Sequence, residues 1–182
     1  MLETETLTID DAIAELDEQL AALGDALEEY DDDTDEFGAL ASRRDRLTYF
    51  RRGLQWERDE REWKDEAIEI GAITAGEKAM MNREAPSNAD DDEMTIWYAA
   101  ASTVSGAFVG DDLSATFATL ADCHPGFVEW IEAKANALGI PGGSGNATPS
   151  SASSTGQPMS DTATSETTSN SSTSSSSASH TD

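Results

Sequence analysis

The sequence predicts a mainly α-helical protein, in which an N-terminal helical hairpin is followed by a small helical domain and a disordered tail. Three observations support this prediction. Apolar residues recur at heptad spacing over 9–30, an apolar stripe continues over 35–63, and 20 of the last 32 residues are Ser or Thr. We place the hairpin in residues 1–64, the small domain, with at most one short β element, in 65–140, and the tail in 141–182.

The first predicted helix carries an apolar seam along one face. Its members follow one another at alternating spacings of four and three residues: Ile9, Ile13, Leu16, Leu20, Leu23, Leu27 and Tyr30. This a/d pattern is typical of a helix that packs lengthwise against another helix. We expect Thr8 to cap the N-terminus, because its hydroxyl can accept a hydrogen bond from a backbone N–H of the first turn.

The second predicted helix runs from about Asp35 to Trp63 and returns antiparallel to the first. Its apolar stripe consists of Phe37, Leu40, Leu47, Phe50 and Leu54. The acidic run between the helices, residues 31–38, resembles a calcium loop only in its alternating aspartates. Glu36 occupies the position where that loop needs Gly, and Ser42 the position of its bidentate Glu. We therefore expect a solvated loop at this point.

The charge of the chain is large and unevenly distributed. The formal net charge is −26, with 37 acidic residues against 11 basic ones, and eight of the basic ones lie within residues 43–64. Dispersed acid with scarce lysine is typical of proteins that stay hydrated in concentrated salt, which indicates a haloarchaeal host or its virus. At 1 M salt the Debye length is only about 3 Å. The apolar seam must therefore hold the hairpin, while the charges select its register and partner.

A nucleic-acid partner is a further alternative that the arginines of segment 43–64 suggest. Arginines can contact phosphates, and neighbouring aromatic rings can stack on bases. However, phosphate binding weakens steeply as salt rises, and a net charge of −26 repels a polyanion. We therefore expect a protein partner and no nucleic acid, and a DNA-associated regulator is the least favoured alternative.

Short elements are expected over residues 65–140. Ile68 and Ile70 flank an acidic residue, and this alternation predicts a short strand. Thr74 and Glu77 form the pattern of a capping box, which opens a helix. Further helices are expected over 94–108, after Asp111 or Asp112, and over 127–138.

No arrangement in the sequence predicts catalysis, a cofactor or a metal site. Cys123 and His124 are neighbours in the chain, which directs their side chains apart instead of aligning a nucleophile with its base. Metal-ligand spacings and phosphate-binding glycine loops are not found. Neither a signal peptide nor an apolar run of about 20 residues is recognisable. We expect a non-enzymatic protein of the high-salt host cytoplasm that is not secreted and contacts no membrane.

Two segments carry a resemblance to a known family. IEIGAITAGEKAMM (68–81) combines an I-x-I strand with T-x-G-E at a helix start, and GDDLSATFATLADCHPGFVEWIEAKANALG (110–139) contains two small helices. Together they resemble the tail assembly chaperones of long-tailed viruses, here of a haloarchaeal virus or provirus. The resemblance covers about residues 65–140 and does not extend to the heptad helix or the arginine-rich arm. It implies a small protein that coats a helical tape-measure protein, keeps it soluble and helps to recruit tail tube subunits.

The partner-binding residues that we predict all lie in the second helix. The apolar and aromatic ones are Leu47, Phe50, Leu54, Trp56 and Trp63, and the arginines that would set orientation are Arg43, Arg44, Arg51 and Arg52. Ordinary core packing is the competing interpretation, favoured for the first three and weighed equally for the tryptophans. The alternative function is a virion structural or scaffold-like protein that self-associates through the apolar seam of residues 9–30.

Overall fold

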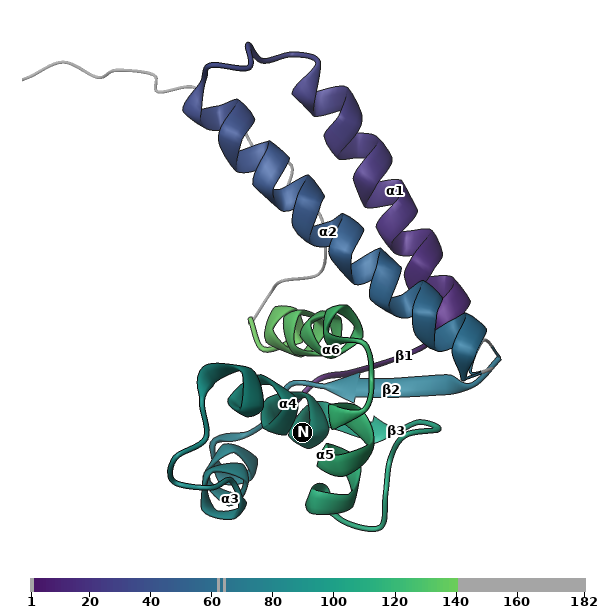
Figure 1. Cartoon of the computed structure of the whole chain (residues 1–182), viewed down its shortest axis with the longest axis vertical. Coiled ribbons are helices and arrows are strands. Elements are labelled where there is room, and N and C mark those ends of the chain that lie inside the picture. The colour runs from purple at the N-terminus through teal and green to yellow at the C-terminus, as the bar shows by residue number, and fades with distance from the viewer. Residues whose placement is uncertain (1, 62, 64, 141–182) are drawn as a thin grey trace, which may run out of the picture. The chain divides into compact units, whose positions relative to one another are not determined.

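The computed structural model confirms a mainly helical protein (Figure 1). It describes residues 2–61, 63 and 65–140, so the predicted tail over 141–182 lies outside the described residues. In chain order the elements are β1 (Thr4–Thr8), α1 (Ile9–Leu27), α2 (Asp35–Glu60), β2 (Ala67–Gly71), α3 (Ala75–Glu84), α4 (Asp91–Ser102), β3 (Thr103–Ser105), α5 (Leu113–Ala121) and α6 (Pro125–Leu138).

Helices α1 and α2 form the predicted hairpin and pack side by side (Figure 1). The apolar seam of α1 faces α2, and its buried members are Ile9, Ile13, Leu16, Leu23 and Leu27. Leu20 is half-buried against the same core. Tyr30 is exposed, because α1 ends at Leu27 and the tyrosine falls in the following turn. Apolar packing therefore joins the two helices, as the heptad spacing predicts.

Side-chain caps fix the starts of three helices at the predicted positions. The Thr8 hydroxyl accepts the Asp11 backbone N–H at 3.1 Å, and Asp11 accepts the Thr8 N–H in return. Thr74 and Glu77 form the second capping box. Asp112, rather than Asp111, caps α5 by accepting the N–H of Ala115 at 2.8 Å. Each cap satisfies a backbone donor that the first helical turn leaves without a partner.

The β structure exceeds the one short element that the sequence predicts. Three antiparallel strands form one sheet in the order β1-β2-β3. The predicted strand around Ile68 and Ile70 is β2, the central strand, which pairs with β1 through Leu7 opposite Ile68. β3 replaces the end of the helix expected over 94–108, since Thr103 and Val104 are β-branched and fit a strand better than a helix.

One hydrophobic core joins the hairpin, the sheet and helices α4 to α6. Its fully buried side chains come from both the predicted hairpin segment, 1–64, and the predicted small domain, 65–140. They include Ile9, Leu54, Ile68, Ile70, Phe127 and Ile131. Lys134 of α6 adds a polar connection, because its ammonium group contacts Glu5 of β1 at 2.9 Å and Glu15 of α1 at 2.7 Å. Within the described ranges, no helix has both the length and the apolar character needed to cross a bilayer.

Candidate functional site

The arginine-rich helix α2 crosses the start of α6 at two glycines. A Cβ atom on Gly53 would lie 2.3 Å from the Phe127 nitrogen, and one on Gly126 would lie 2.6 Å from the Tyr49 carbonyl oxygen. Real side chains do not tolerate such distances, so only glycine permits this close approach of the two backbones. The crossing fixes the rotation of α2, and it therefore determines which of its side chains point outward.

A buried carboxylate holds the same crossing in place. Glu57 of α2 is completely buried and accepts the backbone N–H of His124 at 2.5 Å. Its second oxygen lies 3.1 Å from Nε of Arg61, one helical turn further on. Arg61 also donates to the backbone carbonyl of Asp122 at 2.6 Å. Each residue of the pair is thus hydrogen-bonded to the turn between α5 and α6, which offsets part of the cost of removing its charges from water. The second oxygen of Glu57 has the ion pair but no hydrogen-bond partner among the described residues.

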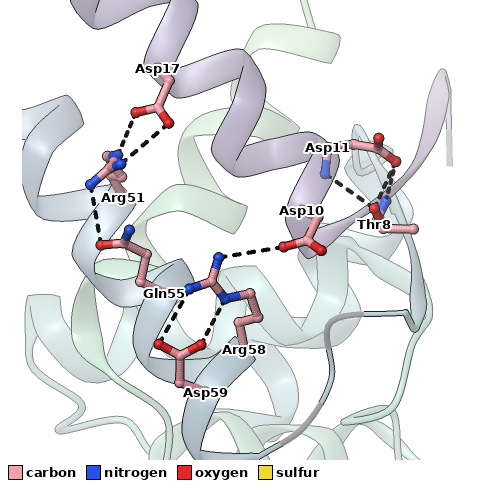
Figure 2. A network of polar contacts seen from close by, with 8 residues as sticks. All are labelled: Thr8, Asp10, Asp11, Asp17, Arg51, Gln55, Arg58 and Asp59. Carbon is pink, nitrogen blue, oxygen red and sulfur yellow. Dashed lines mark hydrogen bonds and ion pairs between the residues drawn. The ribbon is translucent and has the colours of Figure 1, made fainter.

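The arginines of α2 divide into two groups. Arg51 makes a two-point contact with Asp17 of α1, and Arg58 reaches Asp10 of α1 at 3.6 Å as well as its neighbour Asp59 (Figure 2). These pairs place basic residues of α2 beside the acidic first helix, as the sequence predicts. They are partly exposed and therefore contribute little stability at high salt.

The remaining predicted arginines are directed to solvent. Among the described residues, the Arg44 guanidinium pairs with the adjacent Asp45 alone, at 3.1 Å. Arg43 and Arg52 are exposed and form no ion pair within the described part of the chain. Of the four arginines predicted to orient a partner, Arg51 is therefore engaged inside the hairpin, and three remain accessible.

The predicted apolar contact residues also separate into two groups. Leu47, Phe50 and Leu54 are core residues, in agreement with the competing interpretation of ordinary packing. Trp63 is partly buried against Phe108 and Phe127, with ring-centroid distances of 5.7 and 6.3 Å.

Trp56 and Trp63 are seven residues apart, which predicts that they share one side of a helix, but the structure does not place them so. Helix α2 ends at Glu60, so Trp63 lies beyond the helix and turns toward the core. Trp56 remains on the helix and is 52% exposed. It is the one predicted apolar contact residue among the described side chains that is largely open to a partner.

Trp56 belongs to an exposed aromatic cluster that the sequence analysis did not recognise. Tyr49, two turns earlier on the same face of α2, is 37% exposed. The imidazole of His124 lies between them, 5.7 Å from the Tyr49 ring and 6.4 Å from the Trp56 ring. Arg52 stands between the two aromatic residues on the same helical face. We call Tyr49, Arg52, Trp56 and His124 the docking face.

Cys123 and His124 have separate structural roles. The imidazole Nδ1 of His124 accepts the Gly126 N–H at 3.0 Å and caps α6. The Cys123 thiol contacts the Thr119 carbonyl oxygen at 3.4 Å. Burial, together with the charge of Glu57, raises the pKa of Cys123 to about 12, so the thiol is protonated at neutral pH. Within the described residues, no three His, Cys, Asp or Glu side chains are grouped so that they could hold a metal ion.

The fold and the docking face define a small helical protein with an exposed aromatic and basic surface. Comparison with protein-family models, with curated proteins and with solved structures finds no match.

Proposed function

We propose that this protein binds a helical protein partner through the docking face and acts as a tail assembly chaperone for a tape-measure-type protein. The observation that carries the proposal is the exposure of Trp56 and Tyr49 beside Arg52 on one face of α2. Trp, Tyr and Arg are the residues most enriched among those that dominate protein-binding energy. The resemblance over residues 65–140 supplies the particular role, and that role would be carried out in the host cytoplasm.

The energetics of the docking face suit a partner that must be covered and later released. A buried Trp removes about 150–250 Å² from water, at about 25 cal/mol per Å², so covering the exposed half of Trp56 contributes about 2–3 kcal/mol. Tyr49 and the arginine stem add to this amount. Such contacts persist in concentrated salt, where exposed ion pairs are screened. Amphipathic helices commonly bind in this way, by placing an apolar stripe against an apolar surface.

Self-association through the apolar seam is less well supported. Most of the seam is covered by the packing of α1 against α2, and of its members only Tyr30, in the turn after α1, is exposed. Binding of nucleic acid is opposed by the net charge of −26 and by the engagement of Arg51 and Arg58 with aspartates of α1. A helical protein partner makes better use of the exposed aromatic residues than either alternative.

The test is co-expression of the full chain with the tape-measure protein of the same genome in a high-salt host. We expect a soluble complex with the natural chain and a loss of soluble tape measure with Tyr49→Ala/Trp56→Ala. Met80→Ala is the matched control, because Met80 of α3 is 54% exposed and lies outside the docking face. A tape measure that stays insoluble with or without the natural chain contradicts the chaperone role. A complex that forms equally well with the double variant contradicts the docking face.

A further inference from the structure

A cavity of about 520 Å³ opens beside the docking face, and Tyr49 borders both. Its buried wall is apolar and is formed by Leu120, Cys123 and Val128, with the partly buried Ile96. These residues come from α4, α5, the turn after α5, and α6. An occupant of this wall must therefore present an apolar segment to be bound favourably.

Carboxylates from two helices surround the more exposed part of the same cavity. Asp92 lies in the first turn of α4, and Glu129 and Glu132 lie one turn apart on α6. Burial raises the pKa of Tyr49, and the negative charges of Glu129 and Asp92 raise it further. The field of these two carboxylates therefore reaches Tyr49 at the edge of the cavity. Burial raises the pKa of Glu132, and the charge of Arg46 opposes that rise, so this arginine already acts on one of the three carboxylates. Its guanidinium lies over the Phe50 ring, and Arg46 does not line the cavity.

The geometry of these carboxylates suits an extended cation better than a metal ion. They border a cavity large enough for a long side chain, and within the described residues no group of three acidic side chains is close enough to hold a metal. A Lys or Arg side chain combines a flexible apolar stem with a charged head that keeps its hydrogen-bonding donors at the surface. The stem would contact the apolar wall, and the head would meet the carboxylates.

We infer that the cavity beside Tyr49 receives a basic side chain, Arg or Lys, of the helical partner that binds the docking face. This inference rests on the proposed function and names the chemistry that would give it specificity. Tyr49 and Trp56 are two helical turns apart, a rise of about 10 Å. The cavity adjoins the Tyr49 end. The basic residue of the partner should therefore lie at a fixed position near one end of its apolar stripe, and not along its whole length.

The probe is a displayed library of helical peptides with a fixed leucine stripe and random residues elsewhere, selected on the full chain in molar salt. We expect enrichment of Arg or Lys at one fixed offset from the stripe. The variant Asp92→Asn/Glu129→Gln/Glu132→Gln should lose this positional preference. The variant Glu18→Gln/Asp25→Asn/Glu28→Gln changes the net charge equally, at exposed positions of α1 and its C-cap, and should keep it.

A second measurement needs no variant of the protein. The best selected peptide is resynthesised with citrulline or norleucine in place of its Arg or Lys, which removes the charge, and its affinity for the natural chain is compared by Trp fluorescence. We expect about a tenfold loss, because a charge-assisted hydrogen bond at a partly exposed site contributes about 1.5 kcal/mol.

The other outcomes contradict either the inference about the cavity or the proposed function, and they can be told apart. Enriched helices without a fixed basic position, or a neutral peptide that binds equally well, overturn the inference and leave the docking face standing. If Asp92→Asn/Glu129→Gln/Glu132→Gln still selects a basic residue at the fixed position, the preference comes from the acidic surface as a whole. That result also overturns the inference. Failure to enrich any helix contradicts the proposed function itself.

Discussion

Gly53 of α2 and Phe127 of α6 are in backbone contact: a Cβ atom on Gly53 would stand 2.3 Å from the Phe127 nitrogen. This contact sets the crossing of the two helices and hence the position of the docking face. It explains why a glycine occupies the middle of a helix, where it costs about 1 kcal/mol relative to alanine.

Gly53→Ala should destabilise the protein despite the better helix propensity of alanine. The new methyl group would meet backbone atoms of Gly126 and Phe127, which cannot move aside as a flexible side chain could. Overpacking of this kind costs about 1–3 kcal/mol. The measurement is the free energy of unfolding from denaturant titration at fixed salt, followed by Trp fluorescence.

Gly24→Ala is the matched control for this substitution. Gly24 also lies inside a helix, but a Cβ atom there would have no neighbour within 4 Å. The same exchange should therefore stabilise the protein by about 0.5–1 kcal/mol. If both variants shift stability in the same direction, the crossing of α2 and α6 is not constrained as the distances indicate.

Arg61→Met should be far more damaging than the loss of a surface arginine. It leaves the carboxylate of Glu57, which is completely buried, without its cation. Breaking a buried pair costs about 3–5 kcal/mol, and we expect about 2–3 kcal/mol because Arg61 itself is 31% exposed. Arg58→Met removes pairs with Asp10 and Asp59, whose side chains are 56% and 61% exposed, and should therefore cost less than about 1 kcal/mol. Equal losses in the two unfolding titrations would contradict this distinction.

The hairpin should depend on its leucines and not on its ion pairs. Leu23→Ala removes a buried side chain of the apolar seam, and we expect a loss of about 2–3 kcal/mol. Asp17→Asn breaks the contact with Arg51 and should cost less than about 1 kcal/mol, with the difference disappearing as salt is raised. The check is a comparison of unfolding midpoints at low and molar salt. A large, salt-resistant loss in Asp17→Asn would contradict apolar control of the hairpin.

Local patterns were sufficient to predict the helices of the described residues and several of their caps, but not where α2 and α4 end. The seam of α1 and the capping residues Thr8 and Thr74 depend on residues within one or two turns of each other, and the structure contains each as expected. The outer strands depend instead on distant partners. Thr4–Thr8 becomes a strand because Ala67–Gly71 lies beside it. Its three threonines favour extended backbone, but nothing within the five residues specifies that partner.

The candidate site shows the same limit of sequence reasoning. Trp56 and Trp63 have equivalent positions in a heptad pattern, yet one is exposed and the other packs against Phe108, because α2 ends between them. His124 joins Tyr49 and Trp56 only through the crossing of α2 and α6. The spacing of Tyr49 and Trp56 along one helical face was the signal that could have identified the cluster.

Cys123 offers a test of the turn that holds this site together. Burial, with a further contribution from the charge of Glu57, raises the pKa of its thiol from the ordinary 9.0 to about 12. Alkylation requires the thiolate, so iodoacetamide at pH 8 should label the native protein at least about 100-fold more slowly than the denatured protein. Cys123→Ala is the control for labelling elsewhere, and mass spectrometry measures the rate.

The raised pKa of the Cys123 thiol also predicts how the stability of the protein responds to alkaline pH. Above pH 9 the unfolded chain releases the Cys123 proton, while the folded chain retains it until about pH 12. The unfolded state is thereby favoured, so the contribution of this group to stability is complete below pH 9 and decreases between pH 9 and 12. Relative to the natural chain, Cys123→Ala should lose less stability over this interval. Rapid labelling of the native thiol at pH 8, or identical pH profiles of the two proteins, would show that the turn between α5 and α6 admits solvent and does not bury Cys123.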